Sequence, residues 1–240
     1  IPQKNGEPVE LLLERQEILA PEFKVTNEKG VEIPYQAGDF YTGQVLHRPA
    51  AENAIASLSV TGGEVMAMLS LDGGNFVLGA LKENNGRQAS GYVFYKDENL
   101  KAANQNYCGA TMEKHLKGEG MNMNMAEMAG AKNIVKVHFE ADFRTFQDNG
   151  SSVANVVNFV TGLFNMVATI YHHEGITAQI SQVTVWTVAD PYPINSSVGS
   201  GAVLNAFRDA KNLSGINGNL AHLLSTKPVG HGGIAWIDVL

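Results

Sequence analysis

The amino-acid sequence predicts an α+β fold, with a β-rich N-terminal part followed by a three-layer α/β part that contains a mixed sheet. Three observations lead to this prediction. Short runs rich in β-branched and aromatic residues fill the first hundred residues, with turn-forming residues between them. A long apolar run with helical spacing follows at 151–175, and strand-like runs flank it. A stretch rich in glycine and methionine, 112–131, lies between the two parts.

The N-terminal part is predicted to be a small antiparallel β domain covering residues 1 to about 100. The sequence Asp72-Gly73-Gly74-Asn75 is typical of a hairpin turn, because glycine readily adopts the positive φ angles that tight turns need. The predicted strands lie at 38–47, 54–63, 64–81 (a strand, turn and strand) and 90–96.

Residues 112–131 are predicted to be a linker. They show little aliphatic periodicity and contain several glycines and several of the chain's eight methionines. A methionine-rich copper site is the alternative, since thioethers suit soft metals, but no grouping of cysteine or histidine supports it.

The second part begins with a predicted strand and turn at 132–142 and continues into the helix at 151–175. Ser151 or Ser152 can cap the start of this helix, and Gly175 stands where a residue of positive φ ends it. An alternating strand, a second helix and two strand-like runs follow at 176–187, 201–212, 222–228 and 233–240. The turn Asp190-Pro191-Tyr192-Pro193 separates the first strand from the second helix.

Composition excludes several classes of protein. The formal net charge of -7 argues against binding to nucleic acid. We expect no apolar run long enough to cross a bilayer, and we expect that an N-terminal piece, such as a signal peptide, precedes Ile1. One cysteine cannot build a disulfide framework.

No complete active site is visible in the sequence. It contains neither a G-x-S-x-G nucleophile motif nor the zinc motif H-E-x-x-H. His172 and His173 are adjacent on the helix and cannot bind one ion as an i, i+4 pair does, so we interpret them as imidazoles in the last turn that face the negative end of the helix dipole. His231 is interpreted as a loop histidine.

Cys108 has two interpretations that the residues themselves leave open. A free cysteine is usually a small buried hydrophobe. Its neighbours, in the sequence Gln105-Asn106-Tyr107-Cys108-Gly109, are polar or small, and a thiolate binds zinc strongly. The thiol could therefore occupy a metal site on the other part of the molecule.

The order of the motifs resembles the reprolysin, or ADAM-like, branch of the metzincin zinc proteases. The segment FYTGQVLH and the strands after it resemble the family's prodomain, and CGAT at 108–111 is similar to its C-G-x-T cysteine switch. KNIVKVHFEAD and QVTVWTVADPYP resemble the first strand of the protease domain and a later strand that ends in W-x-x-x-D-P-x-P. The resemblance divides the chain into a prodomain (1–111), a linker (112–131) and the N-terminal portion of a zincin-like protease domain (132–240).

The resemblance implies a secreted, periplasmic or cell-surface zinc metalloendopeptidase that is made as a zymogen. Cys108 would hold the catalytic zinc in the latent form. An edge strand containing Gly233, Ile234, Ala235 and Trp236 would bind an extended peptide or protein substrate. The family's zinc helix, H-E-x-x-H-x-x-G-x-x-H, does not occur in the 240 residues. The resemblance therefore implies that residues 132–240 pair with a missing C-terminal part of the protease domain.

Two departures from the family limit the activity expected of these residues. Without the zinc motif no catalytic residue is assigned, and we expect the segment to be inactive alone. Lys136 and Asn219 stand where many relatives place calcium ligands, and an ammonium group does not ligate a cation, so calcium is not predicted. Two alternatives stay open: a non-catalytic binding protein with this fold, or a prodomain that serves as an inhibitor or folding aid.

Overall fold

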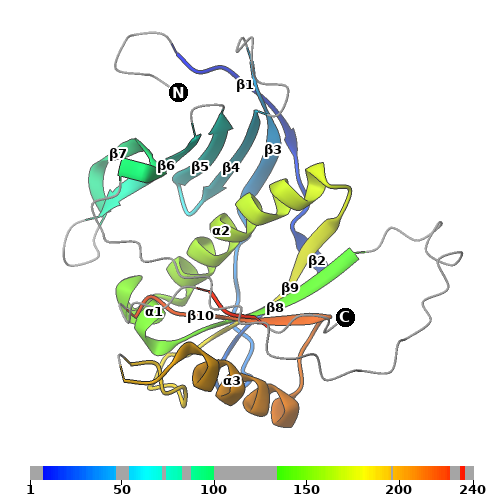
Figure 1. Ribbon diagram of the computed structural model, residues 1–240, viewed down its shortest axis with the longest axis vertical. Helices are drawn as coiled ribbons and strands as arrows, with labels where there is room; N and C mark the ends of the chain where they lie inside the picture. Colours follow the sequence, from blue (N-terminus) through cyan, green and yellow to red (C-terminus); the bar gives the residue numbers. More distant parts are fainter. Residues whose placement is uncertain are drawn as a thin grey trace, which may run out of the picture.

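The computed structural model describes residues 8–46, 54–71, 74–82, 88–99, 134–195, 197–227 and 233–235. Two sheets of strands enclose a long central helix in this part of the chain (Figure 1). The predicted α+β class is confirmed, since one sheet is antiparallel and the other is parallel.

The first sheet is antiparallel, with the strand order β1-β3-β4-β5-β6-β7. Its turn between β4 and β5 consists of Gly62 and Gly63, whose φ angles of 58° and 81° suit a two-residue hairpin. Asp72 and Gly73 of the other predicted turn lie outside the described residues. The strands are β1 (Leu11–Arg15), β3 (Asp39–Val45), β4 (Ile55–Thr61), β5 (Glu64–Leu71), β6 (Gly74–Lys82) and β7 (Gln88–Lys96), after which the 3-10 helix η1 covers Asp97–Asn99.

The second sheet has the order β10-β8-β9-β2, and its described strands are all parallel. They are β2 (Leu19–Asn27), β8 (Ile134–Ala141), β9 (Thr177–Val185) and β10 (Leu220–Leu224). The sequence predicted that the first hundred residues form one antiparallel domain, and this prediction is wrong. The chain passes from β1 in the first sheet to β2, which forms an edge of the second sheet and pairs with β9.

Three helices connect or cover these strands in the described part: α1 (Phe143–Asp148), α2 (Val153–His173) and α3 (Ser200–Ser214). Ser152 caps α2 through its hydroxyl, which accepts the N–H of Asn155 at 3.3 Å, and Gly175 beyond the helix has a φ of 77°, both as predicted. The turn predicted after residue 142 is in fact α1. Helices α2 and α3 lie on opposite faces of the second sheet (Figure 1).

One hydrophobic core joins the N-terminal and C-terminal parts. It combines Ile18, Val25 and Phe40 with the inward face of α2 and with β9. A smaller cluster, built around Ala56 and Leu69, lies in the first sheet and does not include α2. Helix α2 therefore packs against both sheets at once.

Two expectations from the sequence, one about α2 and one about β9, are wrong because each element is buried on more than one side. Helix α2 is long and apolar enough to cross a membrane by length and composition, against the expectation of no such run, but half of that stretch is buried in the protein. Strand β9 was expected to alternate, yet Ala178, Ile180, Ser181, Val183 and Val185 are all buried. A central parallel strand is covered on both faces, which removes the alternation.

Candidate functional site

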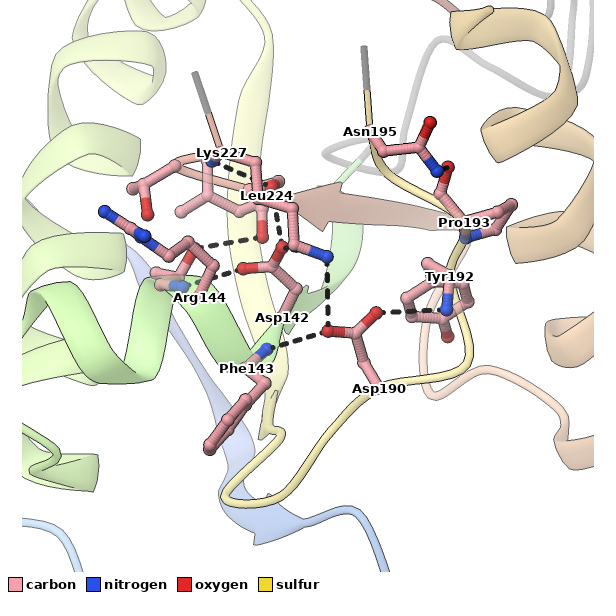
Figure 2. Close-up of polar contacts among 12 residues, drawn as sticks. Asp142, Phe143, Arg144, Asp190, Tyr192, Pro193, Asn195, Leu224 and Lys227 are labelled. Atoms are coloured by element: carbon pink, nitrogen blue, oxygen red, sulfur yellow. Dashed lines mark hydrogen bonds and ion pairs between the residues drawn. The ribbon is translucent and has the colours of Figure 1, made fainter. Parts of the chain in front are cut away.

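The parallel strands β8, β9 and β10 end at the same edge of the second sheet, and polar residues gather there. Asp142 directly follows β8, Asp190 lies in the loop after β9, and Ser225 and Lys227 follow β10. Figure 2 shows that these segments converge. We call Asp142, Asp190, Ser225 and Lys227 the carboxyl-edge cluster.

Asp142 is fully buried and uses both carboxylate oxygens. Its Oδ1 accepts the N–H of Thr145 at 2.7 Å, which caps α1, and its Oδ2 accepts the hydroxyl of Ser225 at 2.6 Å. One side chain thus fixes the start of α1 and the chain that leaves β10.

Asp190 and Lys227 complete the cluster. Asp190 accepts the N–H of Phe143 at 3.2 Å and that of Tyr192 at 3.0 Å (Figure 2). The Lys227 ammonium lies 3.9 Å from Asp142 Oδ2 and 3.8 Å from Asp190 Oδ2, so one cation faces two buried carboxylates. The four carboxylate oxygens are therefore already engaged by N–H groups, a hydroxyl and an ammonium.

Glu140, also buried, forms a second polar group on the α3 side of β8. It accepts hydrogen bonds from the Trp186 indole and the Tyr192 hydroxyl and pairs with the Lys211 ammonium of α3. Burial and the adjacent Glu140 carboxylate raise the pKa of Tyr192, so this hydroxyl stays protonated and donates. Glu140 therefore joins β8, the loop after β9 and α3.

His138 lies on the same face of β8 and links three strands. Its Nδ1 accepts the N–H of Asn217 at 3.3 Å, so the ring proton is on Nε2, which donates to the Thr184 hydroxyl at 2.9 Å. Thr184 in turn bonds to Thr26 of β2 at 3.0 Å. Burial, together with the Lys211 and Lys24 ammonium groups, lowers the pKa of His138 from 6.5 to about 4 despite Glu140 nearby. The histidine is thus a neutral structural link.

Lys136 and Asn219, at the positions of the absent calcium ligands, are used for other contacts. The Lys136 ammonium pairs with Glu22 of β2, and its backbone N–H donates to Asn219 Oδ1 at 2.8 Å. The pair with Lys136 is the main cause that lowers the pKa of Glu22. The lack of calcium itself stays a prediction.

The structure places few of the site residues that the sequence predicted. Cys108 and Trp236 lie outside the described residues. Gly233, Ile234 and Ala235 are described but form no strand, and Gly233 and Ala235 are exposed. Strand β10 ends the second sheet on that side, and its outer edge pairs with no described strand. The assignment of 233–236 to substrate binding stays a prediction.

The sequence missed His138 and Glu140 as buried polar groups. In β8 they alternate with Val137, Phe139 and Ala141, a pattern typical of a strand with one solvent-facing side. Lys211 of α3 pairs with Glu140, and Asn217 in the chain that follows α3 bonds to His138, so this side of β8 does not face solvent. For the carboxyl-edge cluster, the feature of the sequence that could have indicated a site is Asp190, the aspartate of the W-x-x-x-D-P-x-P motif.

One comparison with known proteins finds a family match, and it lies in the second half of the chain. Residues 131–239 match the family model Reprolysin_5, described as metallo-peptidase family M12. The match includes β8, α1, α2, β9, α3 and β10, and it leaves the N-terminal sheet outside. A search of curated proteins finds no match for the chain.

Proposed function

We propose that the chain is part of an exported zinc metalloendopeptidase zymogen, because residues 131–239 match the family model of the reprolysin-like metallopeptidases of family M12. The observation that carries this proposal is the overlap of the family match with the parallel layer β8-β9-β10. Residues 132–240 would be the N-terminal portion of the protease domain. Residues 1–111 would be its prodomain, with Cys108 as the thiol that keeps the enzyme latent.

The described residues do not fit the catalytic zinc. No group of three or more His, Cys, Asp or Glu side chains in this part of the chain is placed to hold a metal. The carboxylates of Asp142 and Asp190 are engaged, and both ring nitrogens of His138 have hydrogen-bond partners. We therefore place the zinc ligands outside the described residues and assign these residues no part in the hydrolytic step.

The role left to this segment is to align the substrate. An extended peptide could pair with the backbone N–H and C=O groups of residues 233–236, which fixes its direction without reading much of its sequence. The carboxyl-edge cluster supports this role because it holds Ser225 and Lys227, through which the chain leaves β10 toward Gly233. The exposed Gly233 places no side chain in the path of a peptide.

A second function, that of a folding aid, is favoured by the position of β2. This N-terminal strand occupies one edge of the sheet that contains the peptidase segment, and its Val25 is in the shared core. A prodomain placed in this way would supply part of the surface on which the protease segment folds. The two functions are compatible in one zymogen.

The activity is tested on the full-length product of the gene. We expect it to cleave an unstructured protein after maturation, to lose this activity with a zinc chelator and to regain it when zinc is returned. Ala235→Pro removes a backbone N–H and should lower kcat/KM by about tenfold or more, whereas Ala235→Gly, which keeps the N–H, should change it little. Hydrolysis that resists the chelator would contradict the metallopeptidase proposal, and equal effects of the two variants would contradict the substrate role.

A further inference from the structure

We propose that the N-terminal region, defined as residues 8–99, stays bound to the peptidase segment after the chain between them is cut. A cut zymogen would then be a two-chain assembly, and the N-terminal region would be a permanent subunit of it. The inference goes beyond the proposed function, because it stands on the contacts between the two parts and not on peptidase activity.

The backbone of β2 is built into the second sheet. It pairs in parallel with β9, with Val25 opposite Val183, Thr26 opposite Thr184 and Asn27 opposite Val185. Just before β2, the carbonyl of Ile18 accepts the N–H of Ile180 at 2.8 Å. Loss of β2 would leave the edge of β9 with unpaired N–H and C=O groups beside a hydrophobic core, which is costly.

Polar side chains reinforce this pairing. The amide of Gln182 donates to the hydroxyls of Thr26 and Thr184, each at 3.0 Å. Glu28, just after β2, accepts both the N–H and the hydroxyl of Thr187, at 3.2 and 3.0 Å. These bonds join the N-terminal strand to two successive parts of the peptidase segment, β9 and the loop after it.

Helix α2 holds the first sheet in a similar way. The side-chain amide of Asn165, which is fully buried, donates to the carbonyls of Tyr41 in β3 and Leu58 in β4, at 3.3 and 3.1 Å. The Tyr35 hydroxyl donates to Asn158 Oδ1 at 2.9 Å. The contact is thus specific in its hydrogen bonds as well as apolar.

Apolar burial adds to these bonds. Ile18, Val25 and Phe40 of the N-terminal region are almost completely buried in the same cluster as Val160 and Phe164 of α2. Separation of the two parts would expose these side chains on one piece and α2 on the other. Large apolar surfaces of this kind are typical of permanent, not transient, association.

Retention of the N-terminal region is compatible with access to the site proposed for substrate. Strand β2 lies at one edge of the second sheet, and β10, which leads toward residues 233–235, lies at the other (Figure 1). A cut in the chain between Asn99 and Ile134 breaks no contact of β2 with β9.

The experiment inserts the recognition site of a specific protease into residues 112–131 of the 240-residue chain. After complete cutting, size-exclusion chromatography with mass spectrometry of each peak should find both pieces in a single peak at the mass of the uncut protein. Two separate peaks, or loss of either piece from the soluble peak, would overturn the inference. Neither outcome depends on hydrolysis by the protein itself.

A matched pair of variants tests the contacts assigned here. Asn165→Ala removes the bonds to β3 and β4 and should weaken the association of the cut pieces by about tenfold or more on dilution. Asn212→Ala, at an exposed position of α3, should leave it unchanged. An equal affinity in both variants would overturn the assignment of the interface.

Discussion

Replacing His138 with glutamine should make the stability of the protein less sensitive to acid. The neutral ring accepts the N–H of Asn217 at Nδ1 and donates to Thr184 from Nε2. Protonation would add a proton to Nδ1, which then faces the donor N–H of Asn217, and would place a charge on a residue that is only 5% exposed. The folded state therefore disfavours the charged ring, while glutamine keeps a donor and an acceptor and has no charge to gain.

The size of the effect follows from the pKa of His138, which is about 4 in the folded protein against an ordinary value of 6.5. Between these two values the unfolded chain binds the proton and the folded protein does not, so stability falls as the pH falls. The cost is small at pH 7, about 2 kcal/mol at pH 5 and about 3 kcal/mol at pH 4, below which it levels off.

Urea unfolding of both proteins from pH 7 to pH 4 measures this difference directly. The free energy of unfolding of the wild type should fall by about 2–3 kcal/mol more than that of His138→Gln over this range. His173→Gln, at an exposed position in the last turn of α2, controls for the loss of an imidazole from the surface. Parallel pH curves for wild type and His138→Gln would refute the reasoning.

Three further predictions concern stability and use the same urea unfolding assay. Lys211→Met leaves the buried Glu140 without its cation and should cost about 3 kcal/mol, most of which the double variant with Glu140→Gln should restore; no recovery would contradict the pairing. Asn165→Asp should destabilise more than Asn165→Ala, because it directs a carboxylate at two carbonyls, and the reverse order would contradict the orientation of the amide. Ser152→Ala removes the cap of α2 and should cost about 1 kcal/mol, so an unchanged stability would argue against the cap.

Much of the fold could be predicted from local patterns. The helical spacing of α2, its serine cap and Gly175 lie within one continuous stretch, and each strand from β3 to β7 pairs with the next one along the chain. The position of β2 could not be predicted, because a strand sequence does not state which sheet it joins. Its partner β9 is more than a hundred residues away in the chain, so no local pattern indicates this pairing.

The candidate site was predictable only in part. The W-x-x-x-D-P-x-P motif contains Trp186 and Asp190. Their partners Glu140 and Lys227 lie in distant segments, so the motif does not predict these contacts. Tertiary packing decides whether a polar residue in an alternating strand faces water or another helix, and α3 covers Glu140 in this protein. The assignment of residues 233–236 to substrate binding depends on the family resemblance alone. The edge strand of the described sheet on that side is β10, and not this segment.

We propose above that the full-length protein is a zinc peptidase kept latent by the thiol of Cys108. The most direct measurement compares the full-length protein carrying Cys108→Ser with the wild type, each before any cut in 112–131. The account predicts that the variant hydrolyses a protein substrate in a zinc-dependent manner while the wild type is latent. Equal activity in the two uncut proteins, whether high or absent, would contradict it.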